Sequence, residues 1–240
     1  NRFVEMGLSA PVNVTWEVTY TCNLRCIHCL SDSGPKRNGE LSTEECFQVI
    51  DALAAMKVFQ FNIGGGEPFM RPDFLALMDY AHQKGMVTCI STNGTLIDKA
   101  VARRLDNKLV YIQVSLDGAT PASNDAIRGR GSFDKVIQAL QCLHQRDIEV
   151  SINTVLTRRS FSELDQLKEL AASVETELQP IVIEVEGQTL RLEGSAETQY
   201  VEWRRLLREI WDTPGPEGGP DRADEQLKLM QGVAWDDLRA

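Results

Sequence analysis

The sequence has no long hydrophobic run and no excess of positive charge. No apolar segment approaches the roughly 18 residues that a membrane-spanning helix needs, and residues 1–13 contain no apolar core of a secretory signal. Lys and Arg number 25 against 35 Asp and Glu, which gives a formal net charge of -10. Because nucleic-acid-binding proteins usually carry a basic face, we expect a cytoplasmic chain with neither a membrane nor a nucleic-acid partner.

Cysteine is scarce, and its distribution is uneven. Of six cysteines, three lie within residues 22–29, the others are Cys46, Cys89 and Cys142, and none follows Cys142. A secreted disulfide framework would spread its cysteines differently over a shorter chain. The three scattered cysteines fall on apolar faces of expected helices and a strand, so we interpret them as core residues. The clustered cysteines instead favour metal or redox chemistry.

Strand and helix patterns alternate over the first two-thirds of the chain. Segments rich in β-branched and aromatic residues predict five strands, at Val12–Tyr20, Phe59–Ile63, Met86–Ser91, Leu109–Leu116 and Ile148–Leu156. Helical periodicity between and after these strands predicts five helices. The first begins at Ser42, and the others cover Asp73–Lys84, Asp98–Asn107, Ser132–Arg146 and Ser160–Val174. This alternation predicts an α/β fold, a partial barrel of five or six β/α units with a parallel sheet, open on one side.

The pattern changes after about residue 175. The sequence predicts a sixth strand at Ile181–Val185, which with Thr189–Leu192 resembles a hairpin, and a helix over Ser195–Trp211. Residues 213–221 are rich in Pro and Gly and predict a linker. We therefore expect a core domain over residues 1–193 and a divergent, helical C-terminal segment over residues 194–240.

Cys22, Cys26 and Cys29 stand in a C-x3-C-x2-C spacing directly after the first strand. Iron–sulfur clusters are usually held by four thiolates, so three thiolates on a four-iron cube leave one iron open to a small chelating ligand. The amino and carboxylate groups of a methionine moiety suit that position. A zinc site with His28 as fourth ligand is one alternative, although adjacent His28 and Cys29 would have difficulty binding the same ion. Buried structural cysteines are another.

Polar and glycine-rich segments stand at the carboxyl ends of the next four strands, at the edge where active sites of β/α barrels lie. They contain Gly65-Gly66-Glu67-Pro68, Ser91 with Asn93, Ser115 with Asp117, and Asn153, and Arg128 follows in the chain. Glycine lets backbone approach a ligand closely, and an Arg fork suits a carboxylate. Each also has a plain structural interpretation, such as a β-turn, a surface salt bridge or a polar strand end.

Taken together, these segments resemble the radical S-adenosylmethionine (SAM) superfamily, with His28 where that family often has an aromatic residue. The resemblance implies one [4Fe–4S] cluster on Cys22, Cys26 and Cys29, and SAM cleaved to a 5′-deoxyadenosyl radical. It implies that the glycine turn and Glu67 receive the SAM amino group, and that Arg128 receives its carboxylate. The full set of cofactor-binding residues that it implies is Gly65, Gly66, Glu67, Pro68, Ser91, Asn93, Ser115, Asp117, Arg128 and Asn153.

Residues 8–160 look most like the radical SAM enzymes that modify ribosomally made peptides, and among these the mycofactocin maturases. The resemblance implies a peptide substrate, oxidative decarboxylation and crosslinking of that peptide, a peptide-recognition chaperone, and a reductant such as flavodoxin or ferredoxin. Those enzymes carry a C-terminal extension, called SPASM, whose cysteines hold auxiliary clusters, and this chain has no cysteine after Cys142. A radical SAM maturase of a cofactor precursor and a non-catalytic Fe–S redox sensor or scaffold remain as alternatives.

Overall fold

The computed structural model describes residues 10–105, 110–155, 160 and 162–181. Six parallel strands form one sheet in the order β1-β2-β3-β4-β5-β6. The strands are β1 Asn13–Thr19, β2 Gln60–Gly65, β3 Thr88–Thr92, β4 Val110–Ser115, β5 Glu149–Val155 and β6 Glu177–Ile181. The helices are α2 Thr43–Ala55, η1 Pro68–Met70, α3 Phe74–Gln83, α4 Lys99–Leu105, α5 Pro121–Arg128, α6 Ser132–His144 and α8 Leu164–Ser173.

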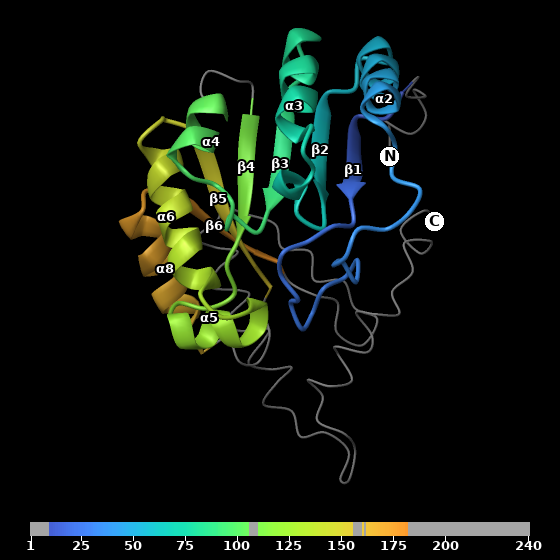
Figure 1. Ribbon diagram of the computed structural model, residues 1–240. Coiled ribbons are helices and arrows are strands. Elements are labelled where there is room, and N and C mark those ends of the chain that lie inside the picture. Colours follow the sequence, from blue (N-terminus) through green and yellow to red (C-terminus); the bar gives the residue numbers. More distant parts are fainter. Residues whose placement is uncertain (1–9, 106–109, 156–159, 161, 182–240) are drawn as a thin grey trace, which may run out of the picture.

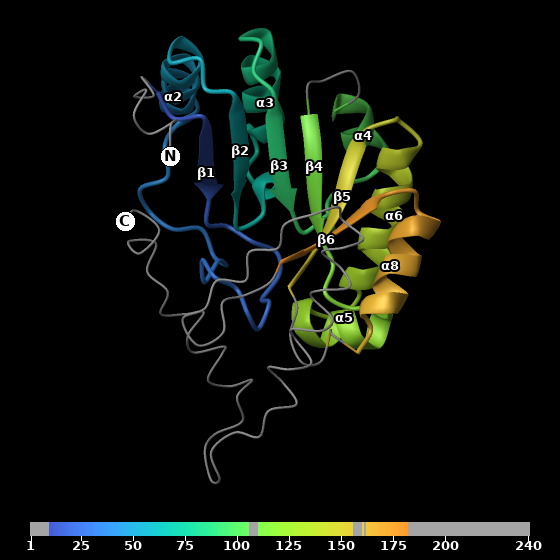
Figure 2. The same cartoon turned by 180° about the vertical axis from the view of Figure 1, so that it is seen from behind.

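The sheet is curved, and the helices line its outer side (Figures 1 and 2). This follows from the strand order, because right-handed crossovers between sequential neighbours place every helix on the same face. The predicted partial barrel of parallel strands is thus confirmed. Among the described helices, none combines the length and the apolar character needed to cross a membrane.

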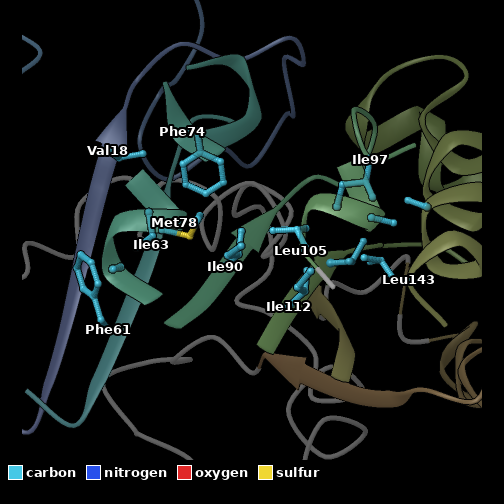
Figure 3. Close-up of a cluster of buried hydrophobic side chains, with 14 of the residues drawn as sticks. Val18, Phe61, Ile63, Phe74, Met78, Ile90, Ile97, Leu105, Ile112 and Leu143 are labelled. Atoms are coloured by element: carbon cyan, nitrogen blue, oxygen red, sulfur yellow. The ribbon is translucent and has the colours of Figure 1, made fainter. Parts of the chain in front are cut away.

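The hydrophobic core lies between the sheet and the helices (Figure 3). Alternate strand residues point to it, among them Phe61, Ile90 and Ile112, which are fully buried. Cys46 and Cys142 belong to this core, as expected, whereas Cys89 is buried outside the core cluster, beside Ile90 in the alternating strand. The core fixes the strands in register and therefore fixes where their carboxyl ends lie.

The opposite face of the sheet is polar toward its carboxyl edge. Ser91 of β3 pairs in register with Gln113 of β4, and Ser115 of β4 pairs with Asn153 of β5. These residues alternate with core residues, so they face the side that the helices leave uncovered. Ser91 is exposed there and donates a hydrogen bond to Gln113 Oε1 at 3.1 Å.

Two elements differ from the sequence prediction. The sixth strand is Glu177–Ile181 rather than Ile181–Val185, and it contains Pro180. Proline is tolerated in such a strand when a ladder hydrogen bond is not needed there, as at a sheet edge. Residues 182–240, including the expected hairpin, helix and linker, lie outside the described residues.

The second difference is α5, a helix that the sequence analysis did not predict. A capping box of Thr120 and Ser123 begins it, Pro121 occupies its first turn, and Gly129 follows its last residue, Arg128. Asp125 of α5 accepts hydrogen bonds from Phe133 N and Ser132 Oγ at the start of α6. Helix α6, which begins at Ser132 as predicted, therefore takes its cap from α5.

Candidate active site

The three clustered cysteines lie on one loop, residues 20–34, which follows β1 and which we call the cysteine loop. In Figure 1 it lies beneath the downward-pointing carboxyl ends of the strands, on the same side as α5. Two backbone hydrogen bonds close it, from Cys22 N to Gly34 O and from Gly34 N to Tyr20 O, both at 2.8 Å. Arg25 Nη1 adds a third bond to Ser33 O at 2.7 Å. These three bonds hold the two ends of the loop together.

Each of the three sulfur atoms has a donor beside it. Leu24 N lies 3.4 Å from Cys22 Sγ, Ser33 N lies 3.3 Å from Cys29 Sγ, and Arg128 Nη1 lies 4.0 Å from Cys26 Sγ. All three thiols are free and half-buried. Donors toward sulfur suit metal-bound thiolates and tune the potential of iron–sulfur clusters.

Burial raises the pKa of the Cys22 and Cys26 thiols, and at Cys26 the Arg128 charge opposes that effect. Metal binding therefore has to displace their protons, which makes the affinity for a cluster dependent on pH.

The structure does not support the zinc alternative. His28 Nε2 lies 2.7 Å from Asp117 Oδ2, so the imidazole turns toward this carboxylate. Within the described residues, no three His, Cys, Asp or Glu side chains gather as the ligands of one metal ion. A four-iron cluster is wider than one ion and takes one cysteine on each ligated iron. Three free thiols on one loop, each with a donor beside its sulfur, match the donor set of that larger group.

The glycine turn after β2 packs against the chain itself. Gly65 has φ +124°, and a Cβ added there would lie 2.2 Å from Thr19 O; a Cβ on Gly66 would lie 2.4 Å from Thr21 O. Gly66 N and Glu67 N donate to the same two carbonyl oxygens, at 2.7 and 2.8 Å. From the sequence, these glycines were expected to give room for a ligand. The structure shows that they also let β2 approach the start of the cysteine loop.

Glu67 is fully buried and links the ends of β2 and β3. Its Oε1 accepts from Thr92 Oγ1 at 2.8 Å and from Phe69 N at 3.2 Å, and its Oε2 accepts from Asn93 N at 2.8 Å. Burial raises the pKa of Glu67 to about 7, although these three hydrogen bonds favour the ionised form. Pro68, which is also buried, begins η1 directly after it.

The Asn93 side chain faces the cysteine loop. Its Nδ2 donates to Asn23 Oδ1 at 2.9 Å and lies 3.8 Å from Cys22 Sγ, and its Oδ1 accepts from Thr95 N at 2.9 Å. The structure therefore brings Asn93, Glu67 and the glycine turn together on one flank of the loop, whereas Ser91, Ser115 and Asn153 lie on the open face of the sheet.

Asp117 and Arg128 form the other flank. Arg128 Nε lies 2.6 Å from Asp117 Oδ2, the same oxygen that faces His28, and Asp117 is fully buried. The sequence analysis placed both residues at the site but did not find their pairing with His28. No local pattern reveals it, because 89 positions separate His28 from Asp117.

With this geometry in place, comparison with known families is decisive. The sequence model of the Radical SAM superfamily matches residues 16–171, which run from β1 through α8. The chain belongs to this superfamily.

Two relatives illustrate the range of radical SAM proteins that the chain resembles. It is 52% identical over 170 residues to mycofactocin maturase MftC of Mycobacterium tuberculosis (strain ATCC 25618 / H37Rv), which covers 70% of this chain and 44% of that protein. It is 38% identical over 160 residues to Fe-coproporphyrin III synthase of Methanosarcina barkeri (strain Fusaro / DSM 804), covering 65% and 40%. The chain thus spans less than half the length of these curated relatives.

Among solved structures, SuiB of Streptococcus suis bound to SAM has the same fold. It superposes with a TM-score of 0.68 at 21% identity, covering 85% of this chain and 48% of SuiB. SuiB bound to its precursor peptide SuiA gives a TM-score of 0.67 at 20% identity, covering 72% and 40%. These comparisons agree with the partial barrel described above.

Membership of the radical SAM superfamily implies two cofactors, a [4Fe–4S] cluster and SAM, as expected from the sequence. Cys22, Cys26 and Cys29 are the residues that would hold the cluster, because they combine the superfamily spacing with sulfur atoms that already face donors.

Proposed function

We propose that this chain is a radical SAM enzyme that binds a [4Fe–4S] cluster through Cys22, Cys26 and Cys29 and modifies a ribosomally made peptide. When bound, the cluster supplies one electron to SAM, whose sulfonium then yields methionine and a 5′-deoxyadenosyl radical that takes a hydrogen atom from the substrate. The observation that carries this proposal is the cysteine loop, which holds three half-buried free thiols, each facing a donor, at the carboxyl edge of a partial barrel.

The chain's own residues would bind and orient SAM. The Gly66 and Glu67 amide groups are already bonded to Thr19 and Thr21, so we propose that backbone oxygens of the glycine turn receive the SAM amino group. Ser91, Ser115 and Asn153 present polar side chains on the open face of the sheet, and we propose that they contact the ribose and the carboxylate. Arg128 adds a cationic fork for the carboxylate.

A peptide substrate is supported by the 52% identity to a mycofactocin maturase and by the fold shared with SuiB. By analogy, we propose oxidative decarboxylation and crosslinking of the peptide, with a recognition chaperone and with flavodoxin or ferredoxin as reductant. We place the protein in the cytoplasm, where thiols stay reduced. We also propose that residues 1–193 form the core and residues 194–240 a separate segment.

A second candidate substrate is a cofactor precursor. One relative, at 38% identity, is named for the synthesis of Fe-coproporphyrin III, which is not a peptide. The polar face around Ser91 and Gln113 offers hydrogen bonds to carboxylates as readily as to a peptide backbone. The core reaction is the same for both substrates, and only the hydrogen donor differs.

Anaerobic reconstitution with iron and sulfide, followed by dithionite and SAM, tests the proposal. We expect 5′-deoxyadenosine from the wild type, loss of both the brown cluster absorption and the product in Cys26→Ala, and retention of both in the core variant Cys142→Ala. Parallel reactions with a precursor peptide and with a tetrapyrrole precursor of iron coproporphyrin, followed by mass spectrometry, separate the two substrates. A cluster without SAM cleavage would support a redox sensor instead, and zinc or no metal on the loop would refute the proposal.

A further inference from the structure

The cysteine loop contacts the end of α5 both directly and through Asp117. Ile27 N donates to Ile127 O at 3.1 Å, His28 Nε2 lies 2.7 Å from Asp117 Oδ2, and Arg128 Nε lies 2.6 Å from the same oxygen. Two of these contacts meet at Asp117, just beyond the carboxyl end of β4. A single carboxylate thus connects the loop between its second and third cysteines with the last residue of α5.

The hydrogen-bonding capacity of Asp117 is used within the chain. Its Oδ1 accepts from Val155 N at 2.8 Å, its own N–H donates to Asn124 Oδ1 at 3.0 Å, and its Oδ2 faces His28 and Arg128. Burial raises the pKa of the Asp117 carboxyl, but Arg128 and His28 outweigh it and hold that pKa below its usual value. The carboxylate is therefore ionised and faces its partners rather than an open site.

Arg128 links Asp117 to the sulfur atom of Cys26. Its side chain is only 9% exposed, Nε points to Asp117, and Nη1 lies 4.0 Å from Cys26 Sγ. A buried guanidinium needs a paired anion to hold it there, since an uncompensated buried charge is costly. A cation beside a cluster ligand favours the more negative, reduced form of the cluster, because reduction adds an electron close to the positive charge.

We propose that Asp117 is a positioning residue that holds Arg128 beside Cys26 and His28 between the cluster ligands, and that it thereby raises the reduction potential of the cluster. This inference rests on the proposed function, because it assumes that the three cysteines hold a cluster. Asp117 then acts through Arg128 and is not itself a SAM ligand, in contrast to the role that the family resemblance implied.

The sign of one measured shift separates positioning from a simple charge effect. Replacing Asp117 by Asn removes a negative charge near the cluster, which by itself would move the potential to a more positive value. If Asp117 positions Arg128, the same substitution also releases the nearer positive charge from Cys26, and the potential moves to a more negative value. We expect the negative shift, in the same direction as for Arg128→Gln.

The experiment is an EPR-monitored redox titration of reconstituted, SAM-free protein. The variants are Asp117→Asn, Arg128→Gln and the double variant, with iron and sulfide content and apo-protein unfolding measured alongside. In the Arg128→Gln background, Asp117→Asn should no longer produce a negative shift. Asp125→Asn is the matched control, because Asp125 is an acid of the same helix whose carboxylate accepts hydrogen bonds from Gly131, Ser132 and Phe133 at the start of α6. This variant should leave the potential unchanged.

The outcomes are distinguishable from failure of the proposed function. A wild type without a cluster refutes both. A wild type that holds a cluster and cleaves SAM, with an unchanged or more positive potential in Asp117→Asn, overturns the positioning role alone. Should Asp117→Asn take up no cluster, Arg128→Gln decides, because an unchanged potential in that variant overturns the inference and a negative shift supports it.

Discussion

The two flanks of the cysteine loop are held by different forces. On the β2 side, backbone packs on backbone, and Gly65 and Gly66 allow this because a side chain there would collide with Thr19 O and Thr21 O. On the α5 side, buried polar and charged side chains hold the loop, because Asp117 contacts both His28 and Arg128. Close packing of backbone on backbone requires glycines, which can be recognised in the sequence. The pairing of distant charged residues produces no local sequence pattern.

The difference also determines how each flank fails. The close backbone packing on the β2 side is insensitive to salt and is disrupted by any added side chain. The buried ion pairs on the α5 side are disrupted when one partner loses its charge. Breaking a buried pair by removing one partner costs about 3–5 kcal/mol. Substitutions at Gly65, Glu67 and Asn23 test whether the β2 flank is as purely steric as its geometry indicates.

The largest effect is expected at Gly65. Alanine there meets a backbone oxygen at 2.2 Å and a φ of +124°, and strained backbone plus overpacking together cost roughly 3–5 kcal/mol. Since folded domains are stable by about 5–15 kcal/mol, we expect a large drop in the urea midpoint of the apo-protein. Gly85→Ala is the control, because φ there is +73° and a Cβ would meet nothing within 4 Å. Equal losses in both variants would contradict the steric account.

Glu67 adds one charge to the otherwise steric flank. Its pKa is raised from the ordinary 4.5 to about 7 by burial, so between these values the folded state binds more protons than the unfolded state. Stability from this group is therefore fully present below pH 4.5 and declines as the pH rises to 7, by about 3 kcal/mol at most.

Glu67→Gln should remove that pH-dependent loss, while lowering stability at every pH, because its amide nitrogen takes the place of one accepting oxygen and then faces the donor of either Asn93 or Thr92. The measurement is the urea midpoint at pH 5.5 and at pH 7.5 for both proteins. The exposed Glu44→Gln should keep the wild-type slope. An identical pH slope in wild type and Glu67→Gln would show that Glu67 is ionised throughout this range.

Most of the fold could be predicted from periodicity, because five of the six strands and their helices bury one regular face. Helix α5 was missed because its apolar content is small, although Thr120, Pro121 and Ser123 form a capping pattern that indicates a helix start. The sixth strand was placed too late because Pro180 argues against a strand in general, while a sheet edge tolerates it.

The site was predictable only where its residues are close in sequence. The spacing of Cys22, Cys26 and Cys29 and the edge on which they lie follow from local pattern and from strand direction. The partners of His28 and of Asn93 do not, because they depend on the path of the cysteine loop between strand ends 70 or more positions apart. Sequence can place residues at one edge of a sheet, but it does not determine which side chains pair there.

The smallest effect is expected at Asn23, the exposed end of the Asn93 contact. Asn23 accepts from Asn93 Nδ2 at 2.9 Å and donates to Thr95 Oγ1 at 2.8 Å, and water can replace both bonds when the side chain is removed. Asn23→Ala should therefore cost less than about 1 kcal/mol and leave the iron content unchanged, whereas Asn93→Ala, which removes a buried amide, should cost about 1–2 kcal/mol. Apo-protein unfolding and iron analysis of both variants check this order. A loss of cluster in Asn23→Ala would mean that these exposed bonds, and not Gly65 and Asp117, hold the loop in place.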